Sequence, residues 1–177
     1  MKERGGDWIQ TYTGRQFWPL DPRPEEVYIE DIAHALSLVC RFAGHCLTFY
    51  SVAQHSVLVS RIVPEHLVLQ ALLHDAAEAY IQDMVRPLKR HSSFGLEYQK
   101  FEEQLMAVIF TAFELDYTIS KEIVEADNIL LMTEKRDLMA IGPGIWKEKA
   151  TPLIDTIQPW SPEQSEEIFL STFRNNY

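Results

Sequence analysis

The segment "ALLHDAAEAY", residues 71–80, constrains the fold of this chain more than any other, because it sets three ionisable side chains among alanines and leucines. Its apolar positions indicate a helix that is buried against neighbouring elements. Burying an ionised carboxylate is costly unless a partner or a metal ion offsets the lost hydration. The sequence therefore predicts that His74, Asp75 and Glu78 meet partners from other parts of the chain.

Helical spacing of apolar residues recurs along most of the sequence, and strands are not well supported anywhere. Ser51 with Gln54, and Ser161 with Gln164, form the capping-box pattern that begins a helix. Pro64 is expected to end one helix and to open the next. The prediction is an all-α bundle of roughly six helices, over residues 29–42, 51–63, 65–80, 96–115, 120–139 and 161–173.

The N-terminal stretch "YTGRQFWPLDPRPEE" carries three prolines and a glycine, which is typical of an extended arm with turns. A chain of 177 residues suits one domain, and no internal repeat or long linker divides it. We therefore expect a single domain over residues 1–177, with an arm over 1–28, a core carrying the site over 29–140, and a C-terminal loop and helix over 141–177.

Charge and hydropathy exclude some classes of function. The formal net charge of −10 opposes a general nucleic-acid binder, which needs surplus Lys and Arg for the phosphate backbone. It does not oppose a small phosphorylated ligand, since a metal ion can supply positive charge locally. No apolar run approaches the roughly 18 residues of a membrane span, and the start "MKERGGDWIQ" lacks the apolar centre of a signal peptide. A cytoplasmic protein with reduced Cys40 and Cys46 is expected.

The ionisable residues suggest a metal site. On an α-helix, residues three or four apart share a face, so Glu78 is expected beside His74 and Asp75. Two ligands from one helix do not make a tight site, because three or four are usual. His55 lies in the preceding helical segment, and Asp127 lies in the apolar run "EADNILLM". One metal ion would satisfy all four candidate ligands.

Together the segments "YSVAQHSVLVS", "LLHDAAEAYIQDMVRPLK" and "EADNILL" resemble the HD-domain metal-dependent phosphohydrolases, over roughly residues 29–140. The similarity is greatest to the 5′-deoxynucleotidase group and to uncharacterised HD-domain hydrolases carried by prophages. It implies an HD-domain helical bundle and a divalent cofactor, with Mn, Co, Mg, Ni, Fe and Zn as candidates. By this resemblance the metal ligands are His55, His74, Asp75 and Asp127, and the catalytic carboxylates are Glu78, as acid or base, and Asp75.

Substrate-binding residues follow from the same resemblance. Arg41 and Phe42, in "CRFAGH", lie close to the position of a phosphate-binding arginine followed by an aromatic residue. A guanidinium offers phosphate a planar fork of hydrogen-bond donors. Asp83 matches a residue that meets the sugar in the deoxynucleotidases, and Lys89 is a second candidate for phosphate. His45 is expected to line the pocket, although its spacing assigns it no role.

The resulting prediction is a 5′-deoxynucleotidase that releases phosphate from deoxynucleoside monophosphates. The metal would lower the pKa of a bound water towards about 7, and Glu78 would position that water or move its proton. Two alternatives stay open: a dNTP triphosphohydrolase, and a non-catalytic HD domain that binds a nucleotide as a regulator. The absence of a GYP signature opposes a cyclic-dinucleotide phosphodiesterase. The expected partners are a small-molecule nucleotide and, by resemblance, a second or further copy of the chain; no membrane partner is expected.

Overall fold

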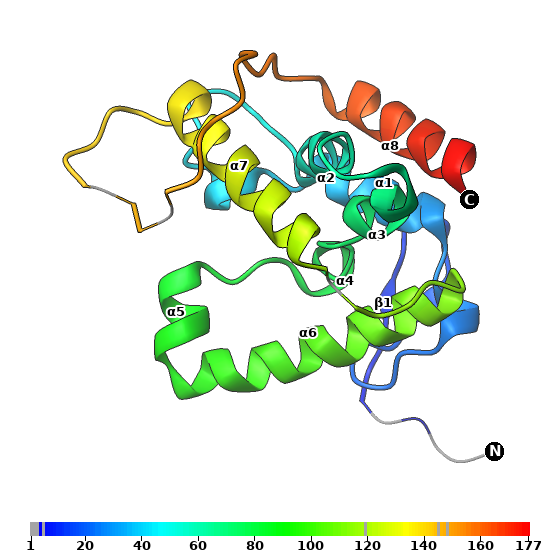
Figure 1. Cartoon of the computed structure of the whole chain (residues 1–177). Coiled ribbons are helices and arrows are strands. Elements are labelled where there is room, and N and C mark those ends of the chain that lie inside the picture. Colours follow the sequence, from blue (N-terminus) through cyan, green and yellow to red (C-terminus); the bar gives the residue numbers. More distant parts are fainter. Residues whose placement is uncertain (1–3, 5, 119, 145, 148) are drawn as a thin grey trace.

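The computed structural model describes residue 4 and residues 6–118, 120–144, 146–147 and 149–177 (Figure 1). It confirms an all-α fold, in which the strands are limited to one short antiparallel hairpin within the described residues. Three 3₁₀ turns interrupt the loops in the described part of the chain. The helices are α1 (Ile29–Leu38), α2 (Val52–Ser60), α3 (Val68–Leu72), α4 (Glu78–Ile81), α5 (Arg86–His91), α6 (Ser93–Ala112), α7 (Lys121–Leu138) and α8 (Pro162–Asn176); the 3₁₀ turns are η1 (Pro24–Glu26), η2 (Arg41–Gly44) and η3 (Glu65–Leu67); and the strands are β1 (Ile9–Gln10) and β2 (Gln16–Phe17).

The two C-terminal helices match the sequence prediction closely, because side-chain caps fix where they begin. The Ser120 hydroxyl accepts the amide of Ile123 at the start of α7. At the start of α8 the capping box is complete: the Ser161 hydroxyl accepts the Gln164 amide, and the Gln164 side chain accepts the Ser161 amide. Such caps satisfy amide groups that have no partner within the helix.

Three other helices were predicted with wrong boundaries. The helix expected over 29–42 ends at Leu38, since the chain becomes extended and Cys40 pairs with Ser51 in an isolated antiparallel bridge. The helix expected over 51–63 ends at Ser60. The helix expected over 96–115 begins three residues early and ends at Ala112. Residues 41–50 consequently form a loop closed at its base by the bridge.

The helix expected over 65–80 is not continuous. It is replaced by η3, α3, a run of turns over 73–77 and α4. Within the turns, the amide of Ala76 bonds to the Leu73 carbonyl and the amide of Glu78 bonds to the Asp75 carbonyl, each at 3.0 Å. These i to i+3 bonds wind the chain at about three residues per turn, so residues three apart eclipse one another. Asp75 and Glu78 still share a face, although no long helix carries them.

Helix α2 occupies the centre of the bundle, where it packs against α1, α3, α7 and α8 (Figure 1). Eight of its nine residues are buried, among them the polar residues Gln54, His55 and Ser56. The Gln54 side chain donates to the Gln158 carbonyl at 2.8 Å and accepts the Trp160 amide at 2.9 Å. A buried amide so paired carries little desolvation cost and fixes the C-terminal segment to α2.

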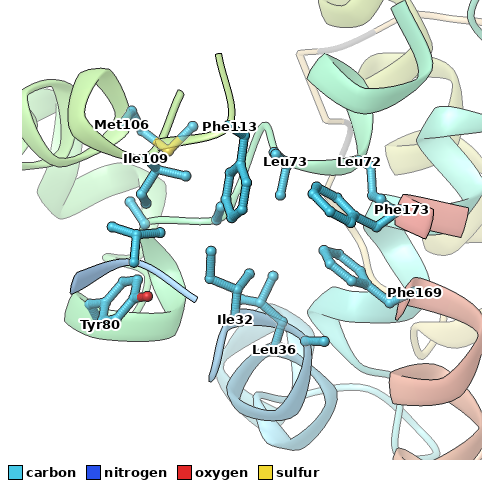
Figure 2. Packing of buried hydrophobic residues seen from close by; sticks show 14 of the residues in the cluster. Ile32, Leu36, Leu72, Leu73, Tyr80, Met106, Ile109, Phe113, Phe169 and Phe173 are labelled. Atoms are coloured by element: carbon cyan, nitrogen blue, oxygen red, sulfur yellow. The ribbon is translucent and has the colours of Figure 1, made fainter. Parts of the chain in front are cut away.

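The main hydrophobic core joins α1, α2, α3, α4, α6 and α8 (Figure 2). Figure 2 shows Phe169 and Phe173 of α8 facing Leu72 and Leu73 on one side and Leu36 of α1 on the other. A second buried cluster lies between α2, α3 and α7. In the described part of the chain, no helix is both long and apolar enough to cross a membrane.

We expect Phe169→Ala to lower the free energy of unfolding by about 3–5 kcal/mol, because the side chain has no exposed surface and its removal leaves a cavity among packed apolar groups. Urea denaturation followed by circular dichroism measures the change. Ile154→Ala is the control, since that side chain is 99% exposed and its truncation should change stability by less than about 0.5 kcal/mol. Equal stability of the two variants would contradict this account of the core.

Candidate metal centre

The four residues predicted as metal ligands come together from three parts of the chain: α2, the turns over 73–77, and α7. The Nε2 atom of His55 lies 3.3 Å from Nε2 of His74, 3.6 Å from Oδ2 of Asp75 and 3.3 Å from Oδ1 of Asp127. One ligand atom each from His55, His74 and Asp75 fits within a 4.8 Å span. This spacing allows a single ion to reach one atom of each of these three residues, and Asp127 lies next to them through its 3.3 Å approach to His55.

Hydrogen bonds on the far side of each imidazole orient both histidines. Nδ1 of His55 lies 2.6 Å from Oε1 of Glu134, and Nδ1 of His74 lies 2.7 Å from the Ala71 carbonyl oxygen. Carboxylate and carbonyl oxygens only accept, so both Nδ1 atoms carry the proton and both Nε2 atoms face the shared point. Ligating histidines are normally held in this way. The side chains present therefore fit a divalent cation, and imidazole with carboxylate admits several first-row metals.

The charges in the cluster favour positive charge at the point that the Nε2 atoms of His55 and His74 face. Burial and the Arg41 cation oppose charge on His55, but Glu134 and Asp127 outweigh them and raise its pKa to about 9. Burial would raise the pKa of Asp127, but the hydrogen bond and charge of His55 hold it below its ordinary value. A metal ion and a proton would thus compete for the same His55 nitrogen.

Glu78 is the first residue of α4 and lies one tight turn beyond Asp75. It is only 5% exposed, and its Oε2 atom has no hydrogen-bond partner in the described structure. Burial, with the negative charges of Asp75 and Asp83, raises its pKa well above the ordinary value for a carboxyl group. A buried carboxyl group with an unengaged oxygen suits proton transfer.

Arg41 extends from η2 into the same cluster, rather than from the helix that the sequence predicted. Its guanidinium contacts Oε2 of Glu134 at 3.1 Å through Nη2 and Oδ2 of Asp75 at 3.4 Å through Nη1. Burial opposes its charge, yet the surrounding carboxylates raise its pKa further. Phe42 and Ala43, which follow it, have φ values of 54° and 51°. Non-glycine residues adopt positive φ angles only at an energetic cost, and residues strained in this way are often found at functional sites.

Two of the other predicted substrate-binding residues, Phe42 and His45, lie in η2 and at its C-terminal end. Phe42 packs against Trp146 with ring centroids 5.9 Å apart, and the Arg41 guanidinium lies 5.4 Å from the Phe42 ring. His45 is exposed at the end of η2. Phe42 thus lies next to Arg41, and the role of His45 stays a prediction.

Asp83 and Lys89 form a second charged group beyond α4. Lys89 Nζ lies 2.7 Å from the Glu102 carboxylate and 4.0 Å from Oδ1 of Asp83. Burial and the charge of Asp75 raise the pKa of Asp83, while Lys89 partly opposes them. The Asp83 side chain is only partly buried, with 52% of it exposed, which leaves it accessible to a ligand, whereas Lys89 already has a carboxylate partner.

Sequence reasoning missed Glu134, which contacts both His55 and Arg41 and has no exposed surface. The available signal was its position seven residues after Asp127 in a predicted helix, which places both carboxylates on one face two turns apart. Tyr50, also fully buried, was missed as well. Burial, together with the charge of Glu134, raises the pKa of Tyr50.

Comparison with known proteins identifies three informative relatives. Uncharacterized protein YfdR of Escherichia coli K12 is 39% identical over 172 residues, covering 95% of this chain and 94% of that protein. An uncharacterized protein of Rhodobacter capsulatus is 36% identical over 128 residues, covering 67% and 64% of the two chains. A 5′-deoxynucleotidase of Vibrio atlanticus is 26% identical over 179 residues, covering 92% and 88%.

No protein-family model matches the sequence. The distant similarity to the Vibrio protein supports the resemblance to HD-domain hydrolases at the level of the superfamily. The match to the Escherichia coli protein is much stronger and extends over nearly the full length of both chains. The chain therefore belongs to the family of Escherichia coli YfdR.

Proposed function

We propose that this chain is a metal-dependent phosphohydrolase acting on nucleotides, with deoxynucleoside monophosphates as the preferred substrates. The observation that carries the proposal is the convergence of two oriented imidazoles with Asp75 and Asp127 beside a buried carboxyl group, Glu78. The 26% similarity to a 5′-deoxynucleotidase supports the same class of substrate. The proposed ligands are His55, His74, Asp75 and Asp127.

A divalent ion held by these four residues would activate a water molecule and neutralise phosphate charge. Two side chains next to this ion, Glu78 and Arg41, have the remaining catalytic roles. Glu78 orients the attacking water and takes its proton, since its buried Oε2 has no protein partner. Arg41 binds the phosphate and stabilises charge on the leaving oxygen through its guanidinium.

The sugar and base are proposed to extend away from the metal ligands. Asp83, which is exposed, would accept a hydrogen bond from the 3′-hydroxyl group, as the resemblance to deoxynucleotidases implies. Phe42 and Trp146 form an aromatic wall next to Arg41 against which a base or sugar can pack. Lys89, which contacts the Glu102 carboxylate at 2.7 Å, would assist with phosphate charge.

The substrate class is tested with purified protein, each candidate metal ion in turn, and a panel of ribo- and deoxyribonucleoside mono-, di- and triphosphates. We expect orthophosphate from the deoxynucleoside monophosphates, and slower release from the ribonucleotides. Inorganic triphosphate from dNTPs would instead identify a triphosphohydrolase. Nucleotide binding without hydrolysis under any metal would indicate a non-catalytic regulator.

We expect Asp127→Asn to weaken binding of Mn²⁺ at least about 100-fold, because the variant loses the anionic oxygen closest to His55 Nε2. Mutation of residues that only hydrogen-bond to a metal ligand typically lowers metal affinity about 10- to 100-fold, and loss of a ligand should cost at least as much. Isothermal titration calorimetry measures the affinity, and phosphate release should fall in parallel. The control is Asp116→Asn, which makes the same change at an exposed loop position. Unchanged affinity in a folded Asp127→Asn protein would remove Asp127 from the ligand set.

We expect Glu78→Gln to separate catalysis from metal binding. Loss of a positioned acid or base should lower kcat by about 10²- to 10⁴-fold, whereas the affinity for Mn²⁺ should stay within about threefold of the unmodified protein. Steady-state phosphate release and calorimetry provide the two readouts. Glu103→Gln, at an exposed position of α6, should change neither quantity. A Glu78→Gln protein that keeps full kcat would exclude Glu78 as the proton-transfer group.

A further inference from the structure

Glu134 is a fully buried carboxylate that no part of the proposed hydrolysis uses directly. It lies on α7, two helical turns beyond Asp127, and faces α2 and the loop formed by residues 41–50. Its two oxygens have different partners: Oε1 lies 2.6 Å from Nδ1 of His55, and Oε2 lies 3.1 Å from Nη2 of Arg41. Burying an anion is costly, and these two partners offset the cost.

We infer that Glu134 is a positioning residue that holds the metal-binding face of His55 and the phosphate-binding guanidinium of Arg41 in one fixed arrangement. The inference deepens the proposed function and rests on it for the role of Arg41. It does not place Glu134 in contact with metal or substrate. The group acts through the two side chains that it orients.

The contact with His55 decides which imidazole nitrogen is available to a cation. A carboxylate that accepts from Nδ1 fixes the proton there and leaves Nε2 directed at His74, Asp75 and Asp127. His55 has no exposed surface, so no solvent molecule can replace that acceptor without a structural change. Glu134 therefore sets both the tautomer and the direction of the ring.

The contact with Arg41 fixes a side chain that arises from a strained loop. Besides Glu134, the guanidinium contacts Asp75 at 3.4 Å, so it spans two of the elements that build the centre. The loop is attached to α7 at a second point, where the Leu47 amide donates to the Leu138 carbonyl at 2.8 Å. Helix α7 thus supplies Asp127, the support for His55 and the support for Arg41 on one rigid element.

A glutamine at position 134 cannot reproduce both contacts. A carboxylate accepts through two oxygens, whereas a carboxamide accepts through one and donates through its nitrogen. In Glu134→Gln, the donating amide nitrogen of the new side chain would therefore face either the Nδ1–H group of His55 or the guanidinium of Arg41, both of which are donors themselves. Glu134→Asp keeps the charge and both acceptors but shortens the side chain by one methylene, so it should retain part of the effect.

The experiment compares the unmodified protein, Glu134→Gln, Glu134→Asp and the control Glu125→Gln, which lies at an exposed position of α7. Calorimetry with MnCl₂ should show 10- to 100-fold weaker binding for Glu134→Gln, a smaller loss for Glu134→Asp and no change for the control. Circular dichroism establishes that each variant is folded. Equal Mn²⁺ affinity in a folded Glu134→Gln protein would overturn the inference.

A second readout needs neither metal nor substrate. In ¹⁵N-resolved NMR spectra of the histidine rings, the Nδ1–H signal of His55 should be protected from solvent exchange in the unmodified protein and lost or shifted in Glu134→Gln. An unchanged signal would also overturn the inference. If both effects occur while no nucleotide is hydrolysed by any of the proteins, the positioning of His55 by Glu134 stands, whereas the proposed function and with it the phosphate-binding role of Arg41 fail.

Discussion

The centre depends on the burial of α2, in which eight of the nine residues are buried. Because α1, α3, α7 and α8 surround this helix, His55 has no access to water and must find its partners inside the protein. A buried imidazole beside Asp127 and Glu134 is stable only if hydrogen bonds and opposite charges compensate for its lost hydration. The polar groups of the neighbouring elements are arranged around this single side chain.

The burial of His55 also determines how the charges around it must balance. Asp75, Asp127 and Glu134 are three carboxylates within reach of His55, and the permanently charged Arg41 contacts two of them, Asp75 and Glu134. The pKa of His55 is raised to about 9, which shows that the site favours a further positive charge at its Nε2 atom. A divalent ion bound there would supply that charge with more ligand contacts than a proton can make.

Much of the site could be predicted because its residues interrupt apolar patterns. His74, Asp75 and Asp127 stand out as polar groups in buried segments, and the spacing of Asp75 and Glu78 survives the change from a regular helix to tight turns. The turns themselves could not be predicted from periodicity. Windings with three and with 3.6 residues per turn bring residues i and i+3 to nearly the same face, so the pattern does not distinguish them.

What sequence reasoning could not supply was the pairing between distant segments. Capping residues mark where a helix starts, which is why α7 and α8 matched, but they do not show that residues 39–41 pair with residues 50–52. That pairing moves Arg41 out of the predicted helix and turns its side chain towards Glu134. Since Glu134 and Asp127 share one face of α7, the docking of that helix against α2 places a proposed metal ligand and the carboxylate that contacts His55 together. The position of α7 thus determines the geometry of the proposed ligands and of Arg41 at once.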